Sequence, residues 1–128
     1  QGRDMDIMQG VMVREVMNQT PETVRMDMPL PDLYRKFQET NFLGFPVLNE
    51  KNRLWGIVTL QGMERILSQN VIKIRGITVD KVAVAEPVTV YPDEPIWNAI
   101  QKMAPRDLAR LPVVSRQSPG LLLGLIGR

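Results

Sequence analysis

Cysteine and histidine are both absent from the 128 residues of this chain. Without cysteine the chain can form no disulfide, thiolate nucleophile or cysteine-ligated zinc site, and without histidine it lacks the commonest general base and metal ligand. We therefore predict no catalytic residue and no metal site, and we do not expect an enzyme. The composition, with 44% hydrophobic and 23% charged residues, is that of an ordinary globular domain.

Long apolar runs and a strong charge of one sign are lacking as well. The longest near-apolar run, GLLLGLIG at residues 120–127, is far shorter than the ~20 residues of a membrane-spanning helix, and it is interpreted as a buried strand. The net charge is only +2 and the 16 basic residues are spread along the chain, so no nucleic-acid partner is expected. Because the chain opens with Gln1 and stops at Arg128 directly after this run, we expect it to be part of a longer protein.

The sequence contains an internal repeat at an offset of 66 residues. Residues 13–48 align without gaps with residues 79–114, and 10 of these 36 positions are identical, where chance would give about two or three. Further along the offset becomes 68, because Gly56-Ile57-Val58 matches Gly124-Leu125-Ile126. The two-residue difference falls in a polar stretch before each of these segments, as expected of a turn.

Each repeat predicts a strand, a helix, a hairpin and a second helix, in that order. The β-prone runs 23–26 and 88–91 come first, and apolar residues at helical spacing follow at 30–37 and 96–103. Two β runs that open with proline each form a hairpin with the apolar run after the turn. A helical face at 63–70 then closes the first repeat, whereas no closing helix follows the second hairpin.

These elements predict an α+β fold in which two β-α-β-β-α repeats pack sheet to sheet about a pseudo-twofold axis. A single unit of about 60 residues buries too little apolar surface to be stable alone, which favours an intramolecular pair. The expected domains are residues 1–74, an N-terminal helical segment with the first repeat, and residues 75–128, the second repeat without its final helix.

The repeated motifs resemble the tandem CBS domain pair, or Bateman module, over the whole chain. The resemblance rests on PETV and EPVTV in the first strands, on GFPV and RLPV at the start of the hairpins, and on GIVTLQG after the first turn. The second copy, VTVYPDEPIWNAIQKMAPRDLARLPVV, is similar to the CBS pairs attached to bacterial chloride-channel (CLC) type transport proteins.

The resemblance implies a regulatory, ligand-sensing module on the cytoplasmic side of an attached transmembrane transport domain. It implies AMP, ADP or ATP as a regulatory ligand in the cleft between the repeats, with no cofactor required, and a second copy of the chain as partner in a homodimer. The residues that the family pattern carries over as nucleotide-binding candidates are Thr20, Thr23, Val24, Phe45, Pro46, Thr59 and Gly62 in the first copy, and Pro87, Thr89, Val90, Leu111 and Pro112 in the second.

Two departures from the family pattern affect the implied site. In the pattern Gly-x-x-Thr-x-x-Asp the Asp holds the ribose, but Gly62 occupies the Asp position of the first copy and Gly127 replaces the Thr of the second. A hydrogen bond to a charged group contributes about 1.5–3 kcal/mol, so loss of the carboxylate would weaken ribose recognition about tenfold or more. The alternative function is therefore a structural dimerisation module that has lost nucleotide binding.

Several candidate residues also have a purely structural interpretation. Thr59 stands where it could cap the helix that follows the first hairpin. Phe45 and Leu111 could simply be core residues of their repeats.

Overall fold

The computed structural model describes residues 9–69, 76–106 and 108–127, and in space these residues form two compact units. The central unit is Glu22–Pro87, and the terminal unit combines the segment up to Pro21 with the segment from Val88 onward. The units are therefore interleaved in sequence, and the domain boundary between residues 74 and 75 stays a prediction.

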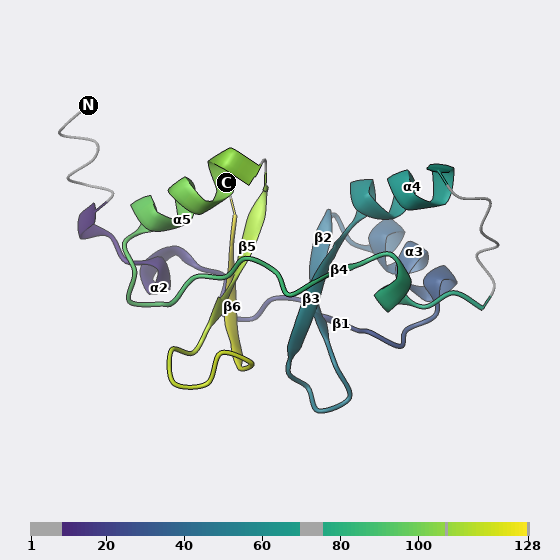
Figure 1. The fold of residues 1–128 in the computed structure, drawn as a ribbon, viewed down its shortest axis with the longest axis horizontal. Coiled ribbons are helices and arrows are strands. Elements are labelled where there is room, and N and C mark those ends of the chain that lie inside the picture. The colour runs from purple at the N-terminus through teal and green to yellow at the C-terminus, as the bar shows by residue number, and fades with distance from the viewer. Residues whose placement is uncertain (1–8, 70–75, 107, 128) are drawn as a thin grey trace. The chain divides into compact units, whose positions relative to one another are not determined.

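The central unit contains a four-stranded mixed sheet in the order β1-β2-β3-β4. Strand β1 pairs in parallel with β2, and the remaining neighbours are antiparallel. Helices α3 and α4 lie together on one side of the sheet (Figure 1). The bounds of the elements are β1 Val24–Arg25, α3 Leu30–Glu39, β2 Gly44–Leu48, β3 Leu54–Thr59, α4 Leu60–Gln69, the 3-10 helix η1 Val79–Lys81, and β4 Val84–Ala85.

The apolar spacing in the sequence explains the core of the central unit. Leu30, Leu33 and Phe37 repeat at helical spacing and are the buried residues of α3, as the pattern at 30–37 predicts. They pack with strand residues and with Met63 of α4 in one cluster. The predicted helix at 63–70 is confirmed over its described residues and begins three residues earlier, whereas Asn70 lies outside the described residues.

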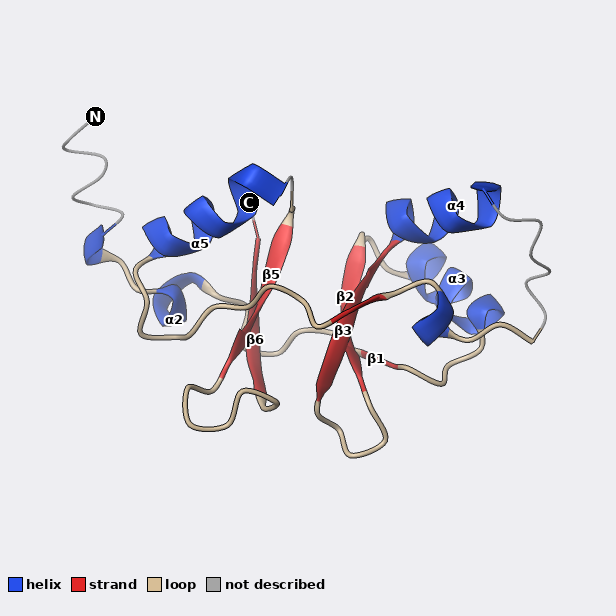
Figure 2. Ribbon diagram, in the orientation of Figure 1, coloured by secondary structure: helices blue, strands red, loops and turns tan. Residues whose placement is uncertain are grey.

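In the terminal unit the described strands are those of one hairpin, and the described helices α2 and α5 lie beside it (Figure 2). Its hairpin pairs β5 with β6, and the hydrophobic cluster beneath includes Ala99 and Met103 of α5. The bounds are α2 Val13–Val16, α5 Ile96–Met103, the 3-10 helix η2 Ala104–Arg106, β5 Arg110–Val114 and β6 Leu122–Gly127. Residues 1–8 of the expected N-terminal helical segment lie outside the described residues.

The structure corrects the prediction of a first strand at residues 88–91 of the second repeat. Of residues 88–91 only Val90 pairs, in one parallel bridge to Val113. The ladder does not extend because its next hydrogen bonds would need the N–H of Pro92 on one side and the N–H of Pro112 on the other, and proline has none. The hairpins, helices and order of elements agree with the α+β prediction.

Each unit is completed by the opening segment of the other repeat. In the central unit β4 pairs with β3, and in the terminal unit Asn18, the repeat counterpart of Val84, pairs with Leu125 of β6. In Figure 1, α2 lies beside α5, although these elements are far apart in the sequence. Among the described residues, no helix is both long and apolar enough to cross a bilayer.

Candidate functional site

In the central unit the fold brings most first-copy candidates to neighbouring strands. Val24 pairs with Val47, which lies next to Pro46 in β2, and Thr59 pairs with Gly44 at the start of that strand. Gly62 lies in the first turn of α4, which begins directly after Thr59. The main chain of β2 therefore connects the position of Val24 with the Thr59–Gly62 turn.

Thr59 caps helix α4, as the structural interpretation predicts. Its Oγ1 accepts a hydrogen bond from the Gly62 N–H at 3.0 Å, which satisfies one of the unpaired donors of the first turn. A Cβ added at Gly62 would lie 2.9 Å from Thr59 Oγ1. Glycine at position 62 thus allows the closest approach of the capping hydroxyl, and that hydroxyl keeps its own proton to donate.

The side chains of Phe45 and Leu111 belong to the cores of their units. Phe45 has 0% and Leu111 has 1% of its surface exposed. The Phe45 ring packs against Phe37 with centroids 5.0 Å apart, contacts Phe42 edge-on, and has Lys36 Nζ 5.4 Å from its centroid. The interpretation of both residues as core is confirmed, and a contact with adenine stays a prediction.

All second-copy candidates except Pro87 lie in the terminal unit, on neighbouring segments. The Val90 N–H donates to the Pro112 carbonyl at 3.1 Å, and Leu111 lies next to Pro112 in β5. Thr89 is held by the Lys102 ammonium through its carbonyl. Each unit therefore places a Thr-Val dipeptide beside a strand that contains proline, which is the repeated arrangement that the motifs predict.

Thr20 and Pro87 lie at the two points where the chain passes from one unit to the other. Thr20 is exposed, and its N–H donates to Asn18 Oδ1 at 3.1 Å within the terminal unit. Pro87 is the last residue of the central unit. Within their own units, neither residue joins the strand positions described above.

A polar network at the start of α5 was not predicted from the sequence. Glu94 Oε2 accepts from the Tyr91 N–H at 2.8 Å and lies 3.5 Å from Lys102 Nζ, and its Oε1 accepts from the Asn98 amide at 3.1 Å. Burial raises the pKa of Glu94, but the hydrogen bonds from Tyr91 and Asn98 and the charge of Lys102 lower it by more, so its pKa lies below the usual value. The sequence feature that could have indicated this network is the lysine at the equivalent positions 36 and 102 of the aligned repeats.

A second ion pair joins the hairpin turn of the terminal unit to the same segment. Arg116 Nη2 lies 2.7 Å from Asp93 Oδ1, and its guanidinium carbon lies 4.2 Å from the centroid of the Tyr91 ring. The hydrogen bond from Arg116 lowers the pKa of the Asp93 carboxyl. Both groups are at least half exposed, so this pair orients the turn and contributes little to stability.

The repeated geometry agrees with a comparison against protein-family models. The model of the CBS domain matches residues 13–68 and again residues 79–128. This chain belongs to the CBS domain family. The two matches make it a CBS domain pair, as the motifs predict.

Relatives of this CBS domain pair differ widely in length and in name. It is 29% identical over 114 residues to a homoserine O-acetyltransferase of Methanococcoides burtonii, covering 89% of this chain and 22% of that protein. This chain spans between 19% and 39% of the length of the curated relatives that match it.

Solved structures share the fold of the CBS domain pair. CBSX2 of Arabidopsis thaliana in complex with AMP is 23% identical with a TM-score of 0.78, covering 93% of this chain and 91% of that chain. The CBS domain of a bacterial CNNM/CorC family Mg²⁺ transporter in complex with ATP is 21% identical with a TM-score of 0.79, covering 98% of this chain and 87% of that chain.

Proposed function

We propose that this CBS domain pair is the regulatory, ligand-sensing module of a longer protein and that it binds adenosine nucleotides. The observation that carries the proposal is the repeated placement of a Thr-Val dipeptide beside a proline-containing strand, at Thr23-Val24 in one unit and Thr89-Val90 in the other. The AMP bound to CBSX2 and the ATP bound to the transporter domain support the ligand class.

Melting temperatures measured with AMP, ADP, ATP and GTP test the proposed ligand. A ligand that binds only the folded state stabilises it by RT ln(1 + [L]/Kd), so 1 mM nucleotide with a Kd of about 0.1 mM would add about 1.4 kcal/mol, a few degrees in Tm. We expect this shift with the adenosine nucleotides only. An equal shift with GTP would contradict adenine specificity, and no shift with any nucleotide would favour the structural function below.

We infer that the host is a membrane transport protein of the CLC chloride-channel type, with the CBS pair on its cytoplasmic side. The resemblance of the second repeat to CLC-attached pairs supports this host, and so does the similar domain of a Mg²⁺ transporter. The sequence that flanks this segment in its gene tests the inference. Apolar segments of about 20 residues would support a transporter, and an enzyme domain in their place would contradict it.

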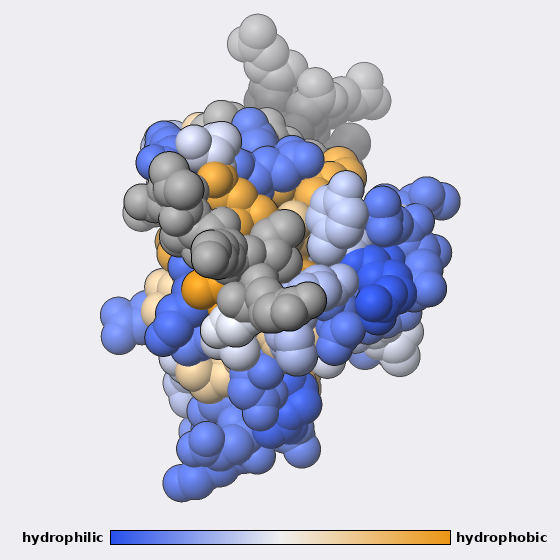
Figure 3. All heavy atoms as spheres, turned by 90° about the vertical axis from the view of Figure 1, so that its right-hand side faces the viewer, coloured by the Kyte–Doolittle hydropathy of each residue, from blue (hydrophilic) through white to orange (hydrophobic). Residues whose placement is uncertain are grey.

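We also propose that two copies of the chain associate in a twofold homodimer. Apolar side chains on the central unit support an interface, since Tyr34, Phe42 and Leu43 are 46–58% exposed. Figure 3 shows hydrophobic residues at the surface on the side where α3 and α4 lie. Sedimentation at high micromolar concentration should give twice the 14.6 kDa of one chain, and a monomer would contradict the proposal.

A structural dimerisation module without a ligand is the second candidate, and the Thr59–Gly62 turn favours it. Gly62 offers no carboxylate to ribose hydroxyls, and Thr59 already accepts the Gly62 N–H. In addition, Phe45 and Leu111 are fully buried. The melting experiment separates the two functions, because only the sensing module gains stability from nucleotide.

A further inference from the structure

The terminal unit is built from two segments that the whole central unit separates in sequence. Five backbone hydrogen bonds of 2.8–3.0 Å join residues 11–18 to the rest of the unit. Two of them are exchanged between Asn18 and Leu125, and Val13, with 0% of its surface exposed, belongs to the core cluster of the unit. The second repeat therefore needs an N-terminal segment to complete its fold.

The chain crosses between the units twice, and both crossings are short and contain proline. The first runs from Asn18, which pairs with β6, to Val24 in β1, and includes Pro21. The second follows Glu86, whose N–H donates to the Trp55 carbonyl at 3.1 Å, and includes Pro87. In a single copy both crossings connect the same central unit with the same terminal unit. This requirement restricts the path that the main chain can take in each crossing.

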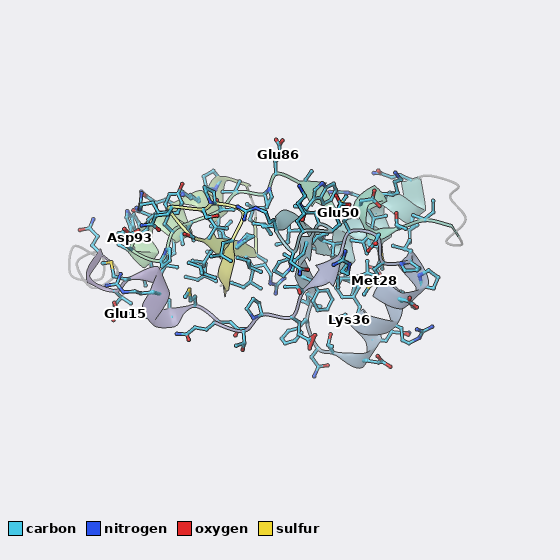
Figure 4. The ribbon with its side chains drawn as sticks, turned by 90° about the horizontal axis from the view of Figure 1, so that it is seen from below. Glu15, Met28, Lys36, Glu50, Glu86 and Asp93 are labelled. Atoms are coloured by element: carbon cyan, nitrogen blue, oxygen red, sulfur yellow. The ribbon has the colours of Figure 1, made fainter. Side chains whose placement is uncertain are left out.

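The second crossing is strained at Glu86. Its φ of 53° lies in the left-handed region, which disfavours residues with a Cβ, and the following proline restricts it further. The Glu86 side chain points away from the ribbon (Figure 4) and is exposed, so it offers no packing that would offset the strain. Strained, short connections between structural elements favour the exchange of those elements between copies.

We propose that two copies of this chain exchange residues 9–18, so that the N-terminal segment of each completes the terminal unit of the other. The exchange keeps every contact within both kinds of unit, because the same residues meet in the same pairs. It also removes the requirement that both crossings of one copy end in one terminal unit. The partner is a second copy of the chain, and the proposal is independent of nucleotide binding.

Disulfide trapping tests the exchange directly, because the chain has no cysteine of its own. Asn18 and Leu125 exchange both backbone hydrogen bonds, so their Cα atoms are about 5.5 Å apart, a separation that a disulfide can span. The single variants Asn18→Cys and Leu125→Cys are mixed in denaturant, refolded together at about 100 µM and oxidised. We expect a covalent dimer of twice 14.6 kDa on a non-reducing gel.

Two controls make the trapping result decisive. The double variant Asn18→Cys/Leu125→Cys, oxidised at high dilution, shows that the pair can form a disulfide. The single variants Ile57→Cys and Val84→Cys, a directly paired set within the central unit, should give no covalent dimer when mixed. If the Asn18→Cys and Leu125→Cys mixture gives no more dimer than this control set, while the double variant oxidises, the exchange does not occur.

Glycine substitutions test the role of strain at Glu86. Glu86→Gly relieves the left-handed strain in the unexchanged chain, so the trapped dimer should fall about fivefold. Asn52→Gly is the matched control, since Asn52 also has a positive φ of 61° but lies in the β2–β3 turn and belongs to neither crossing. An equal yield from both variants would contradict the role given to Glu86.

Discussion

At the scale of single residues, the candidate site is shaped by one capping interaction. Thr59 Oγ1 binds the Gly62 N–H, and the absence of a Cβ at position 62 leaves room for it. Motif comparison located both positions and also suggested the cap. What it could not supply is the 2.9 Å separation between the position of a Cβ and the hydroxyl, which depends on how β3 continues into α4.

The cap is tested by two substitutions of Thr59. Thr59→Val removes the hydroxyl and should lower the free energy of unfolding by about 1 kcal/mol, whereas Thr59→Ser keeps the hydrogen bond and should lie within about 0.5 kcal/mol of the parent. Denaturant unfolding of the three proteins measures both values. Equal stability of the Val and Ser variants would show that the cap contributes nothing.

Gly62→Asp restores the carboxylate that the family pattern has at this position. The new Cβ forces Thr59 Oγ1 to move, which costs about 1 kcal/mol of capping, while loss of glycine and the helix dipole return a similar amount. The free energy of unfolding should therefore stay within about 1 kcal/mol of the parent. An Asp in the first turn of a helix would otherwise be expected to raise it.

The binding effect of Gly62→Asp follows from the proposed function. A restored ribose contact of about 1.5–3 kcal/mol should tighten AMP binding roughly 10- to 150-fold and leave inorganic phosphate unaffected. Calorimetry with AMP and with phosphate measures both affinities. A folded variant that binds AMP no more tightly than the parent would show that position 62 does not face the nucleotide.

Glu94 gives the stability of the terminal unit a pH dependence. Its pKa is lowered in the folded state, so its stabilising effect is complete above the usual pKa of 4.5 and is lost as the pH falls through the folded value. Glu94→Gln should thus be less stable than the parent by about 1 kcal/mol at pH 7, and the difference should shrink as the pH falls below 4.5. A difference that stays constant across this range in urea unfolding would mean that the charge has no role.

At the scale of elements, a glycine marks where a segment crosses the hairpin in each unit. A Cβ at Gly56 would lie 2.4 Å from the Val84 carbonyl oxygen, and one at Gly124 would lie 2.7 Å from the Asn18 carbonyl oxygen. The two sites are equivalent in the repeat alignment, as are the residues that cross them. The close approach of the two main chains therefore requires glycine at both positions.

Alanine at either position should destabilise the chain. Gly56→Ala and Gly124→Ala each force the crossing main chain away from the hairpin, at a cost of about 1–3 kcal/mol. Gly10→Ala is the control, because a Cβ at Gly10 meets nothing within 4 Å, and its effect should stay within about 0.5 kcal/mol. The comparison fails if all three variants unfold at the same denaturant concentration.

The periodicity of the sequence predicted the elements but not that the two units are interleaved in sequence. Helices α3 and α5 and both hairpins follow from apolar spacing and from the prolines that open β runs. This interleaving within one chain could not be predicted, because Val13 and Val79 are identical residues in equivalent positions and either could pack on either unit. The short ladder at Val90 depends on Pro92 and Pro112, which lack the N–H groups that this strand register would need, and periodicity does not give the register.

At the scale of the whole molecule, the chain is a CBS domain pair whose units each depend on a segment from elsewhere in the sequence. Family membership follows from the repeated motifs, and the segment similar to this chain makes up 22% of one longer relative. The proposed ligand binding rests on a few positions of that pattern, from which Gly62 departs. Whether the pair senses a ligand therefore depends on the proposed binding of adenosine nucleotide.

Titration calorimetry of this chain with AMP tests that claim most directly. We predict saturable binding with a Kd of about 0.1 mM and no comparable heat from GMP at the same concentration. Chain concentration should be about 0.1 mM, so that the binding curve and its stoichiometry are both resolved. Absence of saturable heat up to 5 mM AMP, roughly 50 times the expected Kd, would contradict the account and leave the structural module as the function.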